Sequence, residues 1–440
     1  VCAALSAAEQ RVCLVTDSAQ PSFLYTRTSA LFPALQPVPA EDFPFLPDCA
    51  AAAGAALQQI TLPDWLPEAV LLEARTLSQR CTYSFTAMRP EAVRALYGRT
   101  IPLSASKIDR FAGCRYAFFL QYGLRAAPWK QAEFDAPLFG SFVHDVLEHV
   151  VRAAQENGGF AAMTDGEISA LTERCMDACM GTYLPQGEAA ASRERYLSAR
   201  NRQEAAAVVM DVARELRLSQ FAPAAEELRF APGGPLPPIE YRAKSGSGLL
   251  TGQIDRVDIY EADGTRYFRI IDYKTGHKDF DYAELLYGKN LQMLLYLFAL
   301  ESYQKQTGQP MQPAGVLYVP SRCDMVKLKP GEDPAHADNE RRKDLRRKGL
   351  VLNDEAVLHA MESYEKKPQY LPFEHGPDGL AGDLASPAQL AELERFVTGQ
   401  VESMIDEILS GVTAPNPISR GPSDTECKYC DFSSACHKDV

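Results

Sequence analysis

Two aspartates and a lysine in the middle of the chain could bind a divalent cation and cleave a phosphodiester. Asp255 lies in the run Gly-Gln-Ile-Asp-Arg, and Asp272 is followed two residues later by Lys274. Two carboxylates that converge on one point repel each other unless a cation neutralises them, and hard oxygen ligands favour magnesium or manganese. On a strand, Lys274 faces the same side as Asp272, where it can position the attacking water or offset developing negative charge. Taken alone, Asp-x-Lys is equally typical of an ordinary hairpin with a surface salt bridge.

The elements that must position these side chains are a β-hairpin and a helix that follows it. Two β-rich apolar runs flank the turn signal Ala262-Asp263-Gly264, which predicts a hairpin. The two aspartates approach each other only if the arms of this hairpin pair. Residues 285–300 then show helical periodicity and place Gln292 and Tyr296 four apart on one face. A buried strand is expected over Pro313–Val319.

These motifs resemble those of a known family. Gly252–Arg256 and Ile271–Thr275 resemble the nuclease motifs of the RecB-like branch of PD-(D/E)XK enzymes, and the Gln-x-x-x-Tyr pair resembles the motif that follows them. The resemblance implies an α/β fold: a PD-(D/E)XK core of a mixed sheet flanked by helices, with helical insertions. It assigns Asp255, Asp272 and Tyr273 to a Mg²⁺ (or Mn²⁺) ion, and Asp255, Asp272, Lys274, Gln292 and Tyr296 to catalysis.

An upstream helix contributes a candidate imidazole ligand. Gly140 and His144 match the Gly-x-x-x-His motif of the same branch, so the resemblance makes His144 a metal ligand. Glu148 shares its helix face and either reaches the metal through water or solvates the helix. A histidine standing alone is more often a core or half-exposed residue. The two downstream aspartates favour the metal-ligand interpretation, with the sheet edge that carries them facing this helix.

Three cysteines near the end of the chain follow a metal-ligand pattern. Cys427, Cys430 and Cys436 are spaced C-x2-C-x5-C, and on spacing alone zinc and an iron–sulfur cluster are equally compatible. A closed site needs a fourth ligand, and His437 is poorly placed because it is adjacent to Cys436. The aromatic-rich stretch Ile101–Leu124, in which Ser104 or Ser106 can cap a helix, carries a further cysteine, Cys114.

These cysteines narrow the resemblance to the AddB subunits of bacterial AddAB helicase–nucleases. Such nucleases bind a [4Fe-4S] cluster through one cysteine before the nuclease core and three after it, an arrangement that Cys114 and the C-terminal trio match. The cluster would staple the two ends of the domain by closing a long loop. AddB-like chains commonly have proline after the first of these cysteines, whereas this chain has Arg115. Cys175 and Cys179 are interpreted as core residues.

Composition limits the function classes. The 440 residues carry a formal net charge of −13, which argues against tight DNA binding by this chain alone, so a partner subunit is expected to supply basic surface. The sequence has no run of 18 apolar residues and opens with no signal peptide. Eleven cysteines, an odd number, argue for a reducing compartment. We expect a cytoplasmic protein with no membrane contact, and the first residue, Val1, suggests a fragment of a longer chain.

Two domains are expected: residues 1–100, similar to the tail of a helicase-like domain, and residues 101–440, the nuclease domain with its cluster. The first is expected to hold a strand over Arg11–Thr16 and a helix over Ala50–Gln59. No phosphate-binding Gly-x-x-x-x-Gly-Lys-Ser/Thr motif occurs. Near the C-terminus, the basic run Arg341–Lys348 is interpreted either as a charged loop or as a phosphate-tracking patch, and a long helix should start after Ser386.

By resemblance, the function is metal-dependent DNA cleavage, as an exonuclease on the 5′-ended strand. The parent complex would process double-strand breaks for recombinational repair, with DNA ends, single strands and an AddA-like helicase–nuclease subunit as partners. One alternative is a stand-alone exonuclease of the CRISPR-associated Cas4 kind, which also carries four cysteines. Another is a catalytically silent module that binds DNA ends. The intact set of Asp255, Asp272 and Lys274 argues against a silent module.

Overall fold

The computed structural model describes most of the chain from residue 87 onward and short pieces before it. The described residues are 23–32, 68, 72, 87–127, 136–183, 192–276, 278–322, 342–365, 367–377, 379–421 and 424–436. The chain divides into two units, residues 1–84 and 85–440. In the first unit the structure describes helix α2 (Phe23–Leu31). The strand expected over Arg11–Thr16 and the helix expected over Ala50–Gln59 lie outside the described residues.

A six-stranded mixed sheet forms the centre of the second unit, in the order β11-β8-β7-β6-β5-β2. The pairs β6–β7 and β8–β11 are parallel, and the other pairs are antiparallel. The expectation of a mixed α/β fold is therefore confirmed. Its strands are β2 (Ala222–Phe230), β5 (Gly252–Ala262), β6 (Thr265–Lys274), β7 (Gln312–Pro320), β8 (Lys348–Leu352) and β11 (Leu384–Ala385).

The predicted hairpin is formed by β5 and β6. Asp263 and Gly264 both have left-handed backbone angles, with φ of 49° and 75°, as the tight turn of a twisted hairpin requires. Paired residues run from Ala262 opposite Thr265 to Arg256 opposite Ile271. Beyond that last pair the register of the two strands is not continued, and it is there that Asp255 and Asp272 lie.

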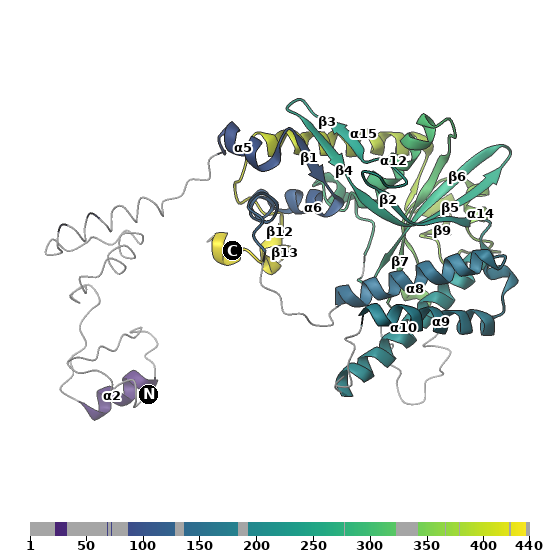
Figure 1. Ribbon diagram of the computed structural model, residues 1–440, viewed down its shortest axis with the longest axis horizontal. Coiled ribbons are helices and arrows are strands. Elements are labelled where there is room, and N and C mark those ends of the chain that lie inside the picture. The colour runs from purple at the N-terminus through teal and green to yellow at the C-terminus, as the bar shows by residue number, and fades with distance from the viewer. Residues whose placement is uncertain are drawn as a thin grey trace. The chain divides into compact units, whose positions relative to one another are not determined.

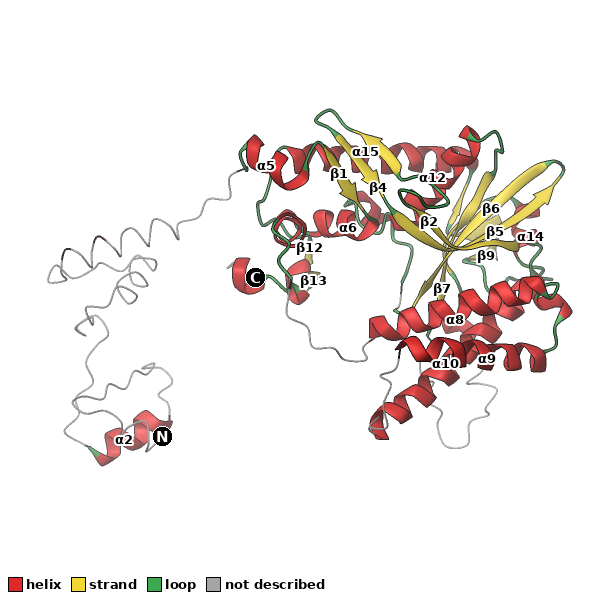
Figure 2. Cartoon of the chain, viewed as in Figure 1, coloured by secondary structure: helices red, strands yellow, loops and turns green. Residues whose placement is uncertain are grey.

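Helices cover both faces of the sheet (Figure 1; Figure 2). On one side lie α8 (Ala136–Glu156), α9 (Asp165–Tyr183) and α10 (Ser192–Leu218), with α8 against β2. On the other side α12 (Gln292–Gln306) packs on β6 and β7, and α15 (Pro387–Leu409) packs on α12. Because α12 is enclosed between the sheet and α15, its residues from 293 to 300 are all buried.

One predicted helix is interrupted. We expected a single helix over residues 285–300, but the structure has α11 (Tyr282–Leu286), a turn, and then α12. Gly288 and Asn290 adopt left-handed backbone angles in that turn, with φ of 76° and 57°, and so end the first helix. Gln292 is therefore the first residue of α12 rather than a residue of its interior.

A smaller sheet lies beside the first. In its order β1-β4-β3, strand β1 (Thr100–Leu103) pairs in parallel with β4 (Ser247–Leu250), which pairs antiparallel with β3 (Ile239–Arg242). Helix α15 crosses this sheet and also contacts α5 and α6. The short helices of this region are α5 (Pro90–Tyr97), α6 (Ala105–Gly113), α7 (Arg115–Phe118) and the π-helical turn Phe119–Gly123.

Two predicted helix starts are confirmed. The Ser104 side chain accepts a hydrogen bond from the Lys107 backbone N–H at the start of α6. At the start of α15, Ser386 and Gln389 form a reciprocal capping box. The remaining described elements are the 3-10 helix Phe160–Ala162, α14 (Glu355–Met361), β9 (Phe373–Gly376), β10 (Gly379–Gly382), β12 (Ser419–Gly421), β13 (Asp424–Thr425), the 3-10 helix Glu426–Tyr429 and α16 (Ser433–Cys436).

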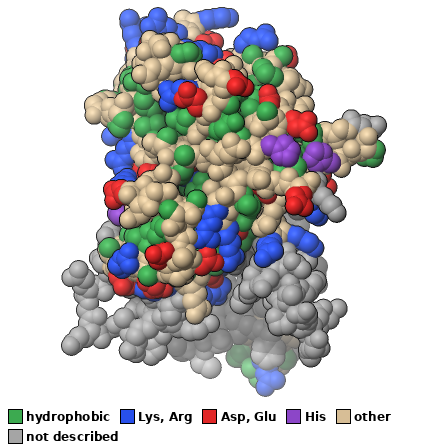
Figure 3. All heavy atoms as spheres, turned by 90° about the vertical axis from the view of Figure 1, so that its right-hand side faces the viewer, with side chains coloured by type: hydrophobic (Ala, Val, Ile, Leu, Met, Phe, Trp, Pro, Cys, Tyr) green, Lys and Arg blue, Asp and Glu red, His purple; other side chains and the backbone are tan. Residues whose placement is uncertain are grey.

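The surface carries both signs of charge. On the face shown in Figure 3, lysine and arginine side chains are interspersed with acidic ones instead of forming one continuous basic area. None of the helices in the described part of the chain is long and apolar enough to cross a membrane.

Candidate metal-dependent active site

The site is built where β5 and β6 part. Past the pair Arg256–Ile271, the backbone of Tyr273 no longer continues the ladder to β5. Its N–H instead donates to Asp255 Oδ2 at 2.7 Å, and its carbonyl lies 2.8 Å from His144 Nε2. One residue of β6 thus joins an aspartate of β5 to a histidine of α8 through its main chain alone.

His144 reaches this point from α8, as expected. Gly140 lies close to the residue after β6, since a Cβ there would be 3.3 Å from the Thr275 side chain, which is tighter than an ordinary contact. With Nε2 donating its hydrogen to the Tyr273 carbonyl, Nδ1 of a neutral imidazole presents a lone pair to Asp255 Oδ2 at 3.4 Å. This lone pair and the Asp255 carboxylate oxygen repel each other unless a proton or a metal cation lies between them.

Asp272 is the most deeply buried acid of the site. Burial, and then the negative charge of Asp255, raise the pKa of Asp272 to about 6, while Lys274 opposes the shift. The Lys274 ammonium forms an ion pair with Asp272 Oδ2 at 2.6 Å, so the two side chains share one face of β6 as the sequence predicts. An acid that is held next to another acid in a buried position is characteristic of sites that bind cations.

Gln292 and Tyr296 both lie on the turn of α12 that faces these strands. Gln292 Nε2 donates to Asp272 Oδ1 at 3.3 Å. The Tyr296 phenol is hydrogen-bonded to the backbone of Gln253 and lies against Gly252, where a Cβ would overlap it. Gln292 therefore orients a site carboxylate directly. Tyr296 instead holds the beginning of β5, which explains why glycine precedes Gln253.

Sequence reasoning missed a third carboxylate, that of Glu227. Strand β2 pairs with β5 through Glu226–Arg256 and Leu228–Ile254, and Glu227 lies between these pairs with a left-handed φ of 51°. One ligand atom each of His144, Glu227 and Asp255 lies within 4.8 Å of the others. The signal in the sequence was the Glu226-Glu227 pair, which was overlooked because no strand was predicted over residues 222–230.

Glu227 lies near several other acidic side chains. Burial, and then the charges of Asp255, Glu148 and Asp145, raise the pKa of Glu227 to about 8. Carboxylate, imidazole and carbonyl ligands together suit a hard or borderline divalent ion. The donor set therefore fits Mg²⁺ or Mn²⁺. The pocket is open to solvent and is lined by Gly140, Ser141, His144, Asp145, Glu227, Gln253, Tyr273, Lys274, Thr275, Gly276 and Lys278.

Glu148, the second acid on the His144 helix, is engaged elsewhere. Its carboxylate accepts a hydrogen bond from Arg152 Nη2 at 2.5 Å. Its charge still acts on Glu227. Glu148 thus contacts Arg152 directly and acts on the site through its charge.

The basic run Arg341–Lys348 does not act as one phosphate-tracking patch. Arg347 is completely buried and binds Asp211 and Glu215 of α10, at 2.5 Å and 2.7 Å. Arg346 donates to the carbonyls of Leu371 and Phe373. Arg347 is therefore part of the interior, and the partly exposed Arg346 is held by backbone carbonyls and by Glu374, so the patch interpretation is wrong for these two arginines. Arg341 lies outside the described residues.

The four cysteines predicted to share a cluster line one apolar pocket. Cys114 connects α6 to α7, while Cys427, Cys430 and Cys436 come from the C-terminal segment, and none of the four is in a disulfide. Backbone hydrogen bonds bring the segments together, because Ile418 N–H donates to the Gly113 carbonyl and Glu426 N–H donates to the Ile418 carbonyl. Phe432 packs against this pocket. His437 lies outside the described residues.

Arg115, which replaces the expected proline, has its own contacts. Its backbone N–H donates to Asn416 Oδ1 at 3.2 Å, and its guanidinium binds Glu407 of α15 in a bidentate pair. A proline could make neither contact. Elsewhere, Cys179 is buried and Cys175 is partly buried against the main hydrophobic core, so the interpretation of both as core residues is confirmed.

Comparison with known proteins gives the following similarities. The sequence profile of the PD-(D/E)XK nuclease superfamily matches residues 102–437. The AddB-type ATP-dependent helicase/deoxyribonuclease subunit of Acetivibrio thermocellus is 32% identical over 357 residues, which cover 80% of this chain and 31% of that protein. The protein of the same description from Caldanaerobacter subterraneus subsp. tengcongensis is 30% identical over 357 residues, covering 79% and 30%. The chain thus spans about a third of the length of the curated relatives it matches.

Proposed function

Because this chain belongs to the PD-(D/E)XK nuclease superfamily and is homologous to part of the AddB subunits of bacterial helicase/deoxyribonucleases, we propose that it is a magnesium-dependent deoxyribonuclease. The observation that carries the proposal is the meeting of Asp255 and His144 at the backbone of Tyr273, beside Asp272 and its ion-pair partner Lys274. These residues come from two strands and a helix, and packing alone gives no reason to gather like charges there.

Each residue has a proposed role. Asp255, Asp272, His144 and the Tyr273 carbonyl would hold the metal ion, and Glu227 would add a further carboxylate. The ion would supply Lewis acidity and an acidified water at the scissile phosphate. Lys274 offsets the negative charge that develops on the phosphate oxygens, and Gln292 keeps Asp272 turned toward the site. The Tyr296 phenol fixes the start of β5, and so the position of Asp255.

Cleavage by matched variants tests this proposal. Asp272→Ala and Lys274→Ala should each lower the rate of Mg²⁺-dependent cleavage of end-labelled DNA by about 10³-fold, because each removes charge stabilisation that acts in the transition state. The controls are Asp177→Ala and Lys305→Ala, which change exposed ion pairs on α9 and α12. Circular dichroism checks that all four variants are folded. Wild-type rates in a folded Asp272→Ala or Lys274→Ala variant would remove this site from consideration.

The role in a larger assembly is also a proposal. The relatives are described as subunits of an ATP-dependent helicase/deoxyribonuclease, which supports a chain that works with an AddA-like partner in the cytoplasm on DNA double-strand ends. There it would degrade the 5′-ended strand for recombinational repair. The net charge of −13 supports this dependence, because it leaves a partner to supply much of the attraction for the DNA backbone.

A polarity assay distinguishes this role from its alternatives. Duplexes labelled at the 5′ or the 3′ end, given to the chain with and without its partner subunit, should lose the strand that ends 5′ only when the partner is present. Vigorous degradation by the isolated chain would instead favour a stand-alone, Cas4-like exonuclease. Binding of DNA ends without cleavage in either condition would favour the silent end-binding module.

For the cysteine pocket we propose a [4Fe-4S] cluster held by Cys114, Cys427, Cys430 and Cys436. Four cysteines around one apolar pocket, none of them in a disulfide, fit four-thiolate ligation, and backbone hydrogen bonds from Ile418 to Gly113 and from Glu426 to Ile418 support this arrangement of the segments. The cluster would add a covalent link between the start and the end of the nuclease domain, which stabilises the domain by restricting the unfolded chain.

The metal content of anaerobically purified protein tests the cluster. We expect iron and an absorption band at roughly 400 nm, both lost when any one of the four cysteines is changed to alanine. Cys175→Ala, a change at a partly buried cysteine on α9, is the matched control and should keep the colour. Zinc in place of iron, or colour that survives Cys114→Ala, would contradict the shared iron–sulfur site.

A further inference from the structure

The hairpin β5–β6 has two chemically different faces. Side chains alternate along a strand, so Asp255 and Asp272 point to one face, which we call the aspartate face. Arg256, Asp258, Arg269 and Tyr273 point to the other, which we call the arginine face. Arg256 directly follows Asp255, and Tyr273 directly follows Asp272, so each site aspartate has a neighbour anchored on the arginine face.

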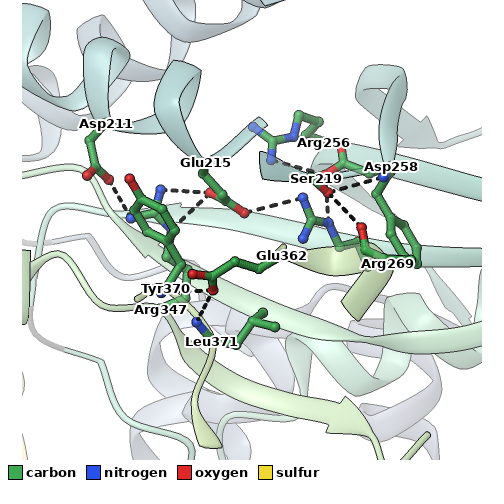
Figure 4. A network of polar contacts seen from close by, with 12 residues as sticks. Asp211, Glu215, Ser219, Arg256, Asp258, Arg269, Arg347, Glu362, Tyr370 and Leu371 are labelled. Carbon is green, nitrogen blue, oxygen red and sulfur yellow. Dashed lines mark hydrogen bonds and ion pairs between the residues drawn. The ribbon is translucent and has the colours of Figure 1, made fainter. Parts of the chain in front are cut away.

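The arginine face is a closed network of buried charges. Arg256 binds Asp258 through two nitrogens, at 2.8 Å and 3.1 Å, and Arg269 Nε donates to the same carboxylate at 2.9 Å. All three side chains are fully buried. Glu215 of α10 lies between Arg269 and Arg347 and extends the network away from the hairpin (Figure 4). Burial alone would raise the pKa of Glu215, but the charges of Arg347 and Arg269 outweigh it and lower that pKa to about 2.

Tyr273 connects this network to the active site. Its phenolic oxygen is buried on the arginine face and accepts a hydrogen bond from Arg256 Nη1 at 2.7 Å. Its backbone N–H and carbonyl contact Asp255 and His144 on the other side. Because the β5–β6 ladder has ended at Arg256, no strand hydrogen bond from β5 holds the Tyr273 main chain in place. On its other edge, β6 remains paired with β7 through Tyr273–Val319 and Lys274–Pro320, so the phenol and its arginine partner are the anchor on the β5 side.

We propose that Arg256 is a positioning residue of the nuclease site: held by Asp258, it fixes the Tyr273 side chain and thereby the main-chain groups that orient Asp255 and His144. The role rests on the proposed nuclease function. Arginine suits it because its planar group can bind a carboxylate with two nitrogens while a third reaches the phenol. Lysine, with a single nitrogen, can serve only one of these partners well.

The test compares Tyr273→Phe and Arg256→Lys with a matched control, Tyr370→Phe. Tyr273→Phe removes only the acceptor oxygen. Tyr370 is a buried tyrosine that packs its ring on Arg347 in the same network but lies away from the site. In chelator-treated protein, hydrogen exchange of the Tyr273 amide should accelerate about tenfold in the two test variants, because its bond to Asp255 is loosened. Mn²⁺ binding measured by titration should weaken by about 10-fold or more, as for other groups that orient metal ligands.

A double-mutant cycle separates positioning from general stability. The double variant Arg256→Lys, Tyr273→Phe should bind Mn²⁺ as tightly as the single variant with the lower affinity, because both changes remove the same hydrogen bond. Equal losses in Tyr370→Phe, or unchanged amide exchange and Mn²⁺ affinity in Tyr273→Phe, would overturn the inference. Failure of the wild-type chain to bind Mn²⁺ or cleave DNA would instead overturn the proposed function, so the two failures are distinguishable.

Discussion

Both faces of the β5–β6 hairpin carry acidic side chains, but they differ in how far basic side chains neutralise that charge. On the arginine face, Asp258, Glu215 and Asp211 are matched by Arg256, Arg269 and Arg347, and the charges are buried and paired. On the aspartate face, Asp255, Asp272 and Glu227 have Lys274 as a close basic partner. In a matched buried network each charge is compensated, and removing one partner leaves an uncompensated buried charge. Unmatched carboxylates oppose folding and become favourable only when a cation arrives.

This difference shows how one pair of strands can carry both rigidity and reactivity. Adjacent residues of the same strand belong to different chemical environments, so the site can be strained by repulsion without loosening the sheet that holds it. The predictions below test whether the faces are as separate as this account requires.

The largest effect is expected on the arginine face. Arg347→Met should lower the free energy of unfolding by about 3–5 kcal/mol, because it leaves Glu215 and Asp211 buried without their closest partner. Urea unfolding measures this loss. Arg242→Met, which removes an exposed pair with Glu240, is the control and should leave the stability almost unchanged. If Arg347→Met cost no more than the control, the buried network would not be the stabilising face.

An intermediate effect is expected from pH in the metal-free protein. The pKa values of Asp272 and Glu227 are raised, to about 6 and about 8, so the folded state holds these protons more tightly than the unfolded chain. Their contribution to stability is complete below about pH 4 and is lost as the pH rises through 6 and then 8. Urea unfolding in chelator at pH 5 and pH 8 measures it.

Two variations sharpen that pH prediction. Asp272→Asn should flatten the part of the curve near pH 6, since the amide does not titrate. Adding Mn²⁺ should restore stability more at pH 8 than at pH 5, because deprotonated carboxylates bind the ion. A stabilising effect of Mn²⁺ that is the same at both pH values would argue against the carboxylates as its ligands.

The smallest effect concerns Glu227. Glu227→Gln should weaken Mn²⁺ binding by about tenfold, because one carboxylate of the candidate site is neutralised. Its neighbour on β2 provides the control: Glu226→Gln changes the same chemical group one residue away, where the carboxylate is 4.0 Å from Arg152. Equal affinities for the two variants would show that Glu227 is not a metal ligand. Asp255 and Asp272 would then be the acids of the site.

Features fixed by local sequence were predictable. The hairpin follows from Asp263 and Gly264, whose left-handed angles suit few other residues, and the start of α15 follows from Ser386 and Gln389. The strand over residues 313–319 was readable from its continuous apolar run, which is typical of a strand covered on both faces. In each case neighbouring residues contain the whole signal.

Features fixed by distant partners were not predictable. Arg347 belongs to a strongly basic run, and only Asp211 and Glu215 on α10 make its burial favourable. Glu227 becomes a site residue because β2 pairs with β5, a contact that the Glu226-Glu227 pair does not by itself indicate. The interruption before α12 is also a tertiary effect, since Asp109 of α6 accepts the Asn290 backbone N–H at 2.8 Å and holds that turn.

The order of the elements along the chain has a consequence for synthesis. The proposed catalytic residues have all been translated by Tyr296, but β8, Arg347 and the covering helix α15 come later. At about 5–20 residues per second, the interval before α15 is complete lasts on the order of ten seconds. During it Glu215 lacks Arg347, and α12 lacks its cover. We therefore expect a nascent chain to carry every catalytic side chain while remaining unable to cut DNA until its last part has left the ribosome.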